Sequence, residues 1–351
     1  MNSSEPDNPG ASLNHCIQST VVTKQVLPLA YGFLFIGSIL LNGLNAWIFM
    51  HVSSNRSFVI YLKNIVFADL LMSITFPFKI LADSGIGPWQ SRVIVCRFSA
   101  VVFYLNMYIG IIFLGLISFD RYYKIVKPLQ ASFFQTLTYS KVICVGIWAT
   151  MLFLLVPNMI LTSRPATEET SKSCSSLKSE LGLQWHKVSS YICLAIFLIT
   201  FLLLIYFYTS ISRKLFSTYK RFRKHDNAAK KRSHRNIFSI MLVFFVCFVP
   251  YHLSRIPYTL SQTGVKFSCE SKTVLFYTKE ITLLMSSANV CLDPVIYFLL
   301  CQPFRKLLLM KMHILKSPEA IETSRSKRSQ TNIDTHIALK YMASSSEPSF
   351  I

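Results

Sequence analysis

The sequence predicts an all-α membrane protein in which a bundle of seven transmembrane helices is followed by a short amphipathic helix. Of the 351 residues, 52% are hydrophobic and only 15% are charged, and the mean hydropathy is +0.42. Soluble domains carry about 25% charged residues. The apolar residues gather in long blocks, each able to cross a hydrocarbon core of about 30 Å as a helix. The predicted spans are Val26–Met50, Phe58–Leu81, Val93–Ile125, Val142–Leu161, Val188–Ser212, Ile237–Leu260 and Thr273–Leu300.

The distribution of charge predicts the orientation of these spans. Basic residues are concentrated after the fifth span, between residues 213 and 235, and again after the third span. Because basic loops stay on the cytoplasmic side of a membrane, we expect an extracellular N-terminus and a cytoplasmic C-terminus. The net charge of +20 is therefore assigned to membrane topology rather than to nucleic-acid binding. The predicted parts are an extracellular tail (1–25), a seven-span domain with its amphipathic helix (26–312) and a cytoplasmic tail (313–351).

The N-terminal tail has no apolar segment typical of a cleaved signal peptide, so the first span is expected to direct insertion. Asn2 begins an Asn-Ser-Ser sequence and is a candidate glycosylation site. The nine cysteines form no metal-binding pattern, and we expect neither a metal nor a cofactor. Four cysteines fall in segments predicted to be extracellular, where disulfides persist: Cys16, Cys96, Cys174 and Cys269.

The third span joins two chemically different ends. Cys96 stands at its start, and the sequence Asp120-Arg121-Tyr122 stands at its other end, with Arg121 25 positions from Cys96. As a helix this segment measures about 37 Å, slightly more than the hydrocarbon core. We therefore expect one end of this helix to belong to a ligand site and the other to a signalling site.

Seven spans with Asp120-Arg121-Tyr122 at the inner end of the third resemble a class A (rhodopsin-like) G protein-coupled receptor. Further motifs of that family stand in the expected spans: Asn42, Asp69, Trp148, Phe244-x-x-Cys247-Phe248-x-Pro250 and Asp293-Pro294-x-x-Tyr297. The resemblance covers roughly residues 26–312. It implies a plasma-membrane receptor with an extracellular ligand and a heterotrimeric G protein as partner, and the family implies the inhibitory class. Gly110 replaces the Ser that many members use to coordinate sodium, which places a sodium site at Asp69 in doubt.

A finer resemblance is to the purinergic nucleotide receptors that sense ADP and UDP-sugars. It rests on several stretches, and three of them are most similar to the UDP-glucose-sensing members: Ser118–Pro128, Asn236–Ile240 and Cys301–Phe304. The other stretches are Phe58–Asn64, Phe76–Ile80, Lys178–Gly182 with Trp185 and His186, Pro250–Thr259, Lys279 and Glu280. The resemblance implies a nucleotide-sugar ligand such as UDP-glucose, with ADP, another nucleotide or a lysophospholipid as alternatives. Ser190 replaces an Asn of the ADP-sensing members, which favours a UDP-sugar.

Cationic residues near the outer ends of the sixth and seventh spans predict a phosphate site. His252, Arg255 and Tyr258 are spaced by three residues and share one helical face. A cation at membrane depth faces a wet cavity or a partner, so Lys279 binds ligand, pairs with Glu280 or extends its side chain to water. Guanidinium and ammonium groups suit phosphate oxygens. The resemblance adds to this pocket the positions Arg92, Tyr104, Asn158, Lys178 and His186.

The resemblance also implies disulfides and a switch. It pairs Cys96 with Cys174 and Cys16 with Cys269. At the inner end, we expect Asp120 to form an ion pair with Arg121 in the resting state. Outward movement of the sixth span about Pro250 would then open a groove for a G protein helix. Tyr122, Tyr208, Tyr297 and Pro294 accompany this switch. A buried polar set is expected to be mutually hydrogen-bonded and water-filled: Asn42, Asp69, Asn289 and Asp293.

Other classes of protein fit less well. A transporter would show internal repeats or broken helices, and neither is evident in the sequence. A retinal photoreceptor needs a lysine at mid-membrane, but Lys279 lies 15 residues before Pro294, about 22 Å along the helix. A membrane enzyme would need a catalytic set, and His186 and His252 have no evident nucleophile or metal partner. The Ser- and Thr-rich C-terminal tail is a candidate for phosphorylation and for binding an arrestin.

Overall fold

The computed structural model describes residues 21–51, 56–127, 136–221, 227–262 and 267–311. The predicted residues Asn2 and Cys16 and the Ser- and Thr-rich tail lie outside these ranges. The chain divides into two compact units, of which the first ends at Cys301 and the second begins at Gln302. The second unit contains α10 (Gln302–Lys311), the short helix predicted after the seventh span.

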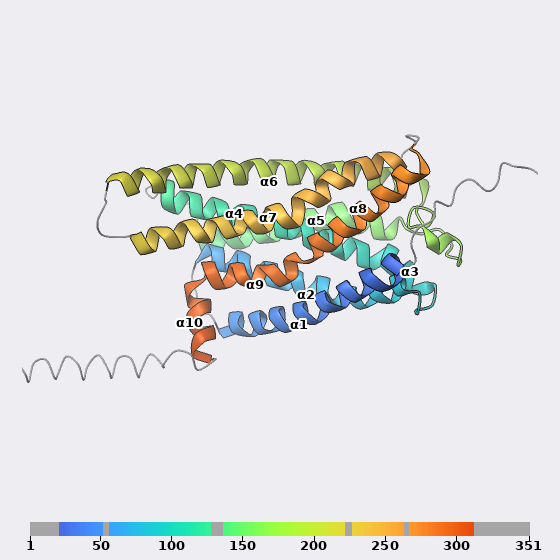
Figure 1. Cartoon of the computed structure of the whole chain (residues 1–351), viewed down its shortest axis with the longest axis horizontal. Helices are drawn as coiled ribbons and strands as arrows, with labels where there is room; N and C mark the ends of the chain where they lie inside the picture. Colours follow the sequence, from blue (N-terminus) through green and yellow to red (C-terminus); the bar gives the residue numbers. More distant parts are fainter. Residues whose placement is uncertain (1–20, 52–55, 128–135, 222–226, 263–266, 312–351) are drawn as a thin grey trace, which may run out of the picture. The chain divides into compact units, whose positions relative to one another are not determined.

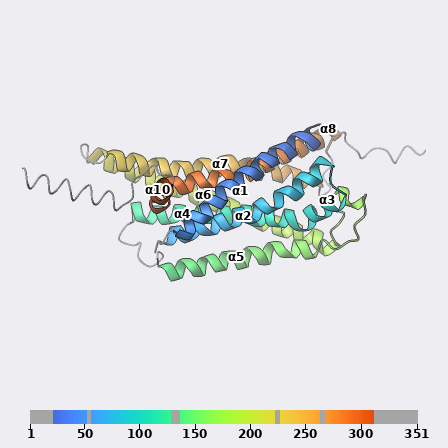
Figure 2. The ribbon, with the colours of Figure 1, turned by 90° about the horizontal axis from the view of Figure 1, so that it is seen from below.

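The first unit is a bundle of helices that run side by side (Figures 1 and 2). The described residues contain seven helical segments long and apolar enough to cross a membrane, as predicted. Helix α3 and a π-helical turn, Val95–Ser99, lead directly into α4, and α8 with α9 makes up the seventh span. The helices are α1 (Leu27–His51), α2 (Ser57–Ser84), α3 (Gln90–Ile94), α4 (Ala100–Val126), α5 (Leu137–Ile160), α6 (Glu180–Arg221), α7 (Asn227–Gln262), α8 (Cys269–Ser287) and α9 (Asn289–Leu300).

Helix α4 lies at the centre of the bundle because it is apolar around most of its circumference. It packs against α2, α5, α6 and α7. Ile109, Ile111 and Phe113 are fully buried within it. It also connects the two ends of the bundle, which we call the Cys96 end and the Arg121 end after the residues at its limits. The predicted extracellular face corresponds to the Cys96 end.

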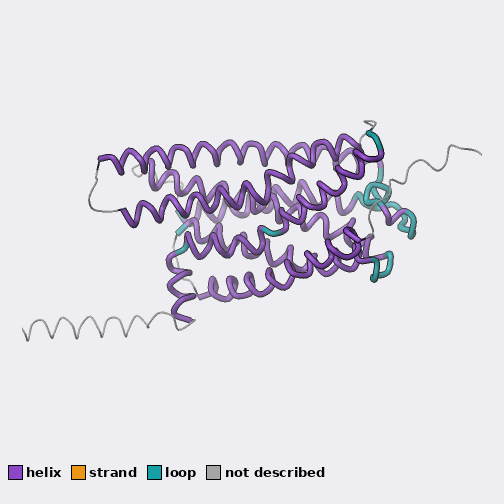
Figure 3. Tube along the Cα trace, in the orientation of Figure 1, coloured by secondary structure: helices purple, strands orange, loops and turns teal. Residues whose placement is uncertain are grey.

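The seventh span is interrupted at Ala288, which separates α8 from α9 (Figure 3). Within α9, Pro294 has no backbone N–H and leaves the carbonyl of Val290, four residues earlier, without its helical donor. The side chain of Asn42 in α1 donates to that carbonyl from Nδ2 at 2.8 Å. In lipid no water replaces a missing backbone partner, so this bond satisfies a group that the proline exposes.

The linker between α5 and α6 (residues 161–179) is fastened at the Cys96 end of the bundle. The predicted disulfide joins Cys96 to Cys174, and the backbone N–H of Ser179 donates to the Leu161 carbonyl at 3.0 Å. Gly182 lies against that carbonyl so closely that a Cβ would stand 2.6 Å from the oxygen. These constraints fix Lys178 next to the first turn of α6. Cys269 is also disulfide-bonded, and its predicted partner Cys16 lies outside the described residues.

Candidate functional site

Arg255 in α7 is surrounded by neutral hydrogen-bonding groups. Its Nη1 donates to Tyr104 Oη in α4 at 3.1 Å, and its Nη2 donates to His186 Nε2 in α6 at 3.4 Å. The guanidinium carbon lies 5.4 Å from the centre of the Tyr104 ring. Three helices therefore meet around a single guanidinium.

Asn158, near the end of α5, extends these contacts to the α5–α6 linker. Its Oδ1 lies 3.4 Å from Lys178 Nζ and 3.3 Å from His186 Nδ1, and its Nδ2 lies 3.2 Å from Ser189 Oγ. Lysine only donates, so the atom facing it is the carboxamide oxygen. The structure thus brings together five of the residues predicted to bind ligand, and we call Lys178, His186 and Arg255 the basic cluster.

The basic cluster carries positive charge without a carboxylate. Among the described residues, neither Arg255 nor Lys178 forms an ion pair. Lys178 lies outside the membrane-spanning helices and is only 8% exposed. Burial, reinforced by the charge of Arg255, lowers the pKa of Lys178 to about 8. An arrangement of cations that lack an anion is suited to binding one.

Lys279 belongs to a second set of charges in which both signs are balanced. Lys279 pairs with its neighbour Glu280 in α8, which is the alternative to ligand binding given above. Glu280 Oε2 also lies 3.6 Å from Lys79 Nζ in α2. Lys79 pairs with Asp83 one turn later at 2.7 Å. We call Lys79, Asp83, Lys279 and Glu280 the ion-pair network.

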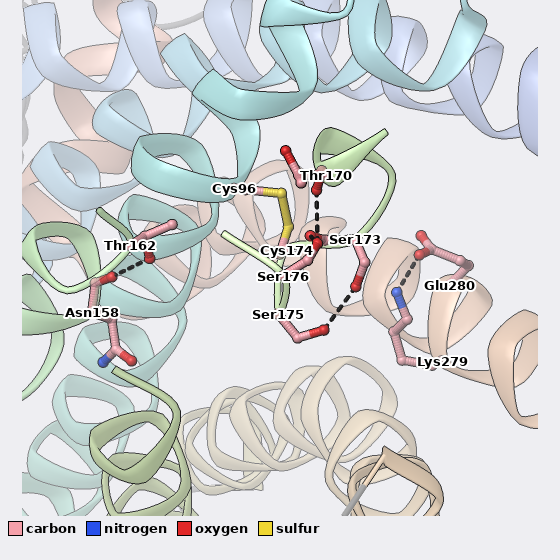
Figure 4. The surroundings of a disulfide bond; sticks show 10 residues. All are labelled: Cys96, Asn158, Thr162, Thr170, Ser173, Cys174, Ser175, Ser176, Lys279 and Glu280. Atoms are coloured by element: carbon pink, nitrogen blue, oxygen red, sulfur yellow. Dashed lines mark hydrogen bonds and ion pairs between the residues drawn. A yellow bond between two sulfur atoms is a disulfide. The ribbon is translucent and has the colours of Figure 1, made fainter. Parts of the chain in front are cut away.

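Sequence analysis did not include Lys79 or Asp83 among the candidate site residues. A signal was present, because a lysine and an aspartate four residues apart near the end of an apolar span indicate a buried ion pair. Figure 4 shows Lys279 and Glu280 near the Cys96–Cys174 disulfide and the serines beside it. The disulfide therefore holds the α5–α6 linker at the end of the bundle where the charged groups lie.

The three remaining predicted ligand residues, His252, Tyr258 and Arg92, belong neither to the group of five around Arg255 nor to the ion-pair network. His252 is deeper in α7, where Nδ1 donates to the Phe248 carbonyl at 2.8 Å and Tyr108 Oη lies 3.2 Å from Nε2. Its two ring nitrogens are thus both engaged within the protein core. Tyr258 faces Lys279, whose Nζ is 5.3 Å from the ring centre. Arg92 in α3 is half-buried and has no side-chain hydrogen bond or ion pair among the described residues.

At the Arg121 end, the predicted ion pair between Asp120 and Arg121 is wrong. Asp120 pairs with Lys124 at 2.8 Å, and the Arg121 guanidinium carbon stacks 4.3 Å from the centre of the Phe58 ring in α2. Consecutive helical side chains point in different directions, whereas residues four apart share a face. Asp120 is buried, and Lys124 is the residue on its face that reaches it.

Aromatic residues connect α4 and α6 at this end. Tyr122 packs with Phe207 and Ile211 in a buried cluster, against which Tyr208 also lies. The Tyr122 hydroxyl is 3.3 Å from that of Tyr206. The predicted pivot Pro250 lies within α7 and is not part of this cluster. The contacts of Tyr122 pack α4 against α6 at the Arg121 end.

The predicted polar set is fully buried, but its members are not mutually hydrogen-bonded. Tyr297 Oη donates to Asp69 Oδ2 at 3.2 Å, and Asn42 bonds to the α9 backbone as described. Within the described chain, both Asp293 carboxyl oxygens and Asn289 Nδ2 have no partner. Side chains on separate helices adopt positions set by helix packing, so a buried polar pair seen in sequence need not touch. No group of three His, Cys, Asp or Glu residues in the described ranges is arranged to hold a metal.

Comparisons with known proteins agree with this architecture. Residues 42–297 match the family model of the seven-transmembrane receptors of the rhodopsin family. Purinoceptor 14 of Bos taurus is 58% identical over 314 residues, which cover 89% of this chain and 93% of the relative. That of Rattus norvegicus is 56% identical over 80% of this chain and 92% of the relative. Purinoceptor 13 of Homo sapiens is 44% identical over 82% of each chain.

The Asp120–Lys124 pair predicts a stability effect at the Arg121 end. Replacing Lys124 with Met leaves a buried carboxylate without its cation, and we expect a cost of about 1–2 kcal/mol, because Lys124 itself is partly exposed. The apparent melting temperature of the purified protein should fall. Combining Lys124→Met with Asp120→Asn should recover most of the loss, and equal melting temperatures for wild type and Lys124→Met would contradict the pairing.

Proposed function

Because the chain belongs to the rhodopsin family of seven-transmembrane receptors, we propose that it is a receptor for an extracellular UDP-sugar such as UDP-glucose. Membership of this family makes it a multi-pass membrane protein with an extracellular ligand and a G protein partner, rather than an enzyme. We propose that the N-terminus is extracellular, so that the Cys96 end receives the ligand. We also propose that the receptor signals through the inhibitory class of G protein.

The observation that carries this proposal is the unpaired charge of the basic cluster. Lys178 is buried and Arg255 is half-buried, and their nearest partners are neutral acceptors on Tyr104, His186 and Asn158. A pyrophosphate supplies the missing negative charge and has several oxygens for these donors. Arginine suits such a group because its planar fork donates two parallel hydrogen bonds.

The ion-pair network supports a sugar rather than a second charged group next to the diphosphate. Its two lysines are balanced by Asp83 and Glu280, so it adds no net positive charge. Carboxylates accept hydrogen bonds from hydroxyl groups, and lysines donate to them. A hexose offers hydroxyls that act as donors and as acceptors. We therefore assign the pyrophosphate to the basic cluster and the hexose to the ion-pair network.

Ligand binding must favour one conformation to produce a signal. Arg255 stands on α7, whereas Tyr104 and His186 stand on α4 and α6. A ligand that holds Arg255 through its phosphates changes the position of α7 relative to these two helices. A thousandfold preference for the signalling conformation supplies about 4 kcal/mol, enough to shift a minor population. Because Tyr122 packs against Phe207 and Ile211 and so joins α4 to α6, we assign the movement to α7.

The first prediction concerns Arg255. Replacing it with Ala removes charge-assisted bonds worth about 1.5–3 kcal/mol, so the potency of UDP-glucose should fall at least about tenfold. Inhibition of cAMP production measures potency, and antibody labelling of intact cells measures surface expression. Lys187→Ala is the matched control, because this exposed lysine directly follows His186 and should not contribute. Unchanged potency in Arg255→Ala at normal surface expression would rule out the phosphate site.

The second prediction separates the sugar from the diphosphate. Replacing Glu280 with Gln removes a hydroxyl acceptor and leaves the two lysines of the network with one carboxylate. The potency of UDP-glucose should therefore fall, while that of UDP should be maintained or rise. Glu180→Gln is the control, because Glu180 is exposed and pairs with Arg164 at the surface. A parallel loss of potency for both ligands would contradict the assignment of the hexose, and a response to ADP alone would contradict the UDP-sugar.

The third prediction follows from the lowered pKa of Lys178, about 8 in the empty receptor. The charge of Lys178 is present below this pH and is lost above it, and a bound diphosphate favours the charged form. The affinity for UDP-glucose should therefore fall as pH rises above 8, by up to about tenfold per unit. This effect is measured as the binding of UDP-glucose to receptor-containing membranes, at pH values below the one at which the uracil ring ionises. Lys178→Arg should abolish the decline, because a guanidinium does not titrate there.

A further inference from the structure

The hydrogen bonds around His186 determine which of its ring nitrogens carries the proton. Arginine only donates, so Nε2, which faces Arg255 Nη2 at 3.4 Å, is an acceptor without a proton. Lysine also only donates, so the Asn158 atom shared by Lys178 and His186 is the oxygen. Nδ1 must then be the donor to that oxygen. His186 is therefore neutral in this arrangement, with its proton on Nδ1.

The surroundings of His186 oppose a second proton while the site is empty. The groups facing it are Arg255 from α7, Lys178 from the linker and the uncharged Asn158 from α5. Tyr104 from α4 reaches the cluster through Arg255. No carboxylate pairs with these residues in the described part of the chain. A proton on Nε2 would place an N–H against the N–H of Arg255, between two cations.

A bound diphosphate reverses this situation. When Arg255 Nη2 donates to a phosphate oxygen instead, His186 Nε2 loses its donor and faces the same anionic oxygens. An unprotonated nitrogen repels such an oxygen, whereas a protonated one donates a charge-assisted hydrogen bond. The charge of the diphosphate therefore favours the imidazolium form of His186, in which both ring nitrogens donate.

We propose that His186 takes up one proton from solvent at Nε2 when the diphosphate of the ligand binds. This inference rests on the proposed function and adds a property to it. The bound receptor holds one more proton than the empty receptor, so binding becomes tighter as pH falls. His186 then makes the receptor more sensitive to its ligand in acidified extracellular fluid.

The proposal is tested by measuring UDP-glucose binding to receptor-containing membranes between pH 5.5 and 7.5. The pyrophosphate of UDP-glucose is a diester whose charge is constant in this range, and Lys178 titrates above it. In the wild type, affinity should rise as pH falls, approaching tenfold per unit. In His186→Gln, whose amide oxygen can still accept from Arg255, affinity should not depend on pH. His51→Gln, at the Arg121 end, should keep the wild-type dependence.

A measurement that needs no variant complements this test. Titration calorimetry of the purified wild-type receptor in buffers of different ionisation enthalpy should show uptake of about one proton per bound UDP-glucose at pH 6.5–7. Binding without proton uptake, or the same pH dependence in His186→Gln as in wild type, overturns the proposal and leaves the proposed function intact. Failure of UDP-glucose to bind at any pH overturns the proposed function, and the proton uptake with it.

Discussion

The arrangement at the Cys96 end depends on a half-buried guanidinium that has no counter-ion in the described part of the chain. Removing a charge from water is costly unless hydrogen bonds replace the lost hydration. Arg255 obtains these bonds from a phenol and an imidazole, so its charge is solvated but not neutralised. A carboxylate in the place of His186 would remove the attraction for an anionic ligand. The neutral partners therefore keep the site both stable when empty and attractive to phosphate.

The charged residues of this end fall into two groups that differ in net charge although both contain two strong cations. In the basic cluster the cations donate to neutral acceptors, whereas in the ion-pair network each lysine meets a carboxylate. Both groups can form further hydrogen bonds, but only the basic cluster has a net positive charge. Two such groups suit, respectively, the charged part of a ligand and its neutral, hydroxyl-rich part.

The fold and many of the residues of the candidate site could be predicted from the sequence, but the hydrogen bonds and ion pairs between those residues could not. Apolar blocks predict spans because lipid forces every backbone group into a helix. The position of Arg255 and Lys279 near the outer ends of their spans predicted cations at one end. The spacing of Lys79 and Asp83 contains their ion pair, but the contact of Lys79 with Glu280 connects α2 to α8, and no sequence spacing contains that contact. The expected ion pair between Asp120 and Arg121 is not formed because neighbouring residues of a helix point in different directions. Lys124, four residues after Asp120, lies on the same helical face and pairs with it.

Helix α2 connects events at the two ends because three other helices contact it at successive levels. Glu280 of α8 meets Lys79 near the Cys96 end, Tyr297 of α9 bonds to Asp69 at mid-depth, and Arg121 of α4 stacks on Phe58 near the Arg121 end.

Of the two polar contacts, the one between Lys79 and Glu280 has the longer distance between its atoms, 3.6 Å against 3.2 Å for Tyr297 and Asp69. A hexose that bonds to Glu280 competes with Lys79 and loosens α8 from α2, while Tyr297 still ties α9 to the same helix. Ala288 interrupts the seventh span between these two contacts, so the Lys79–Glu280 contact belongs to α8 and the Asp69–Tyr297 contact belongs to α9. Helix α7 carries Arg255 and continues through Pro250 and Pro257 without ending, so a single helix joins the basic cluster to the rest of the bundle.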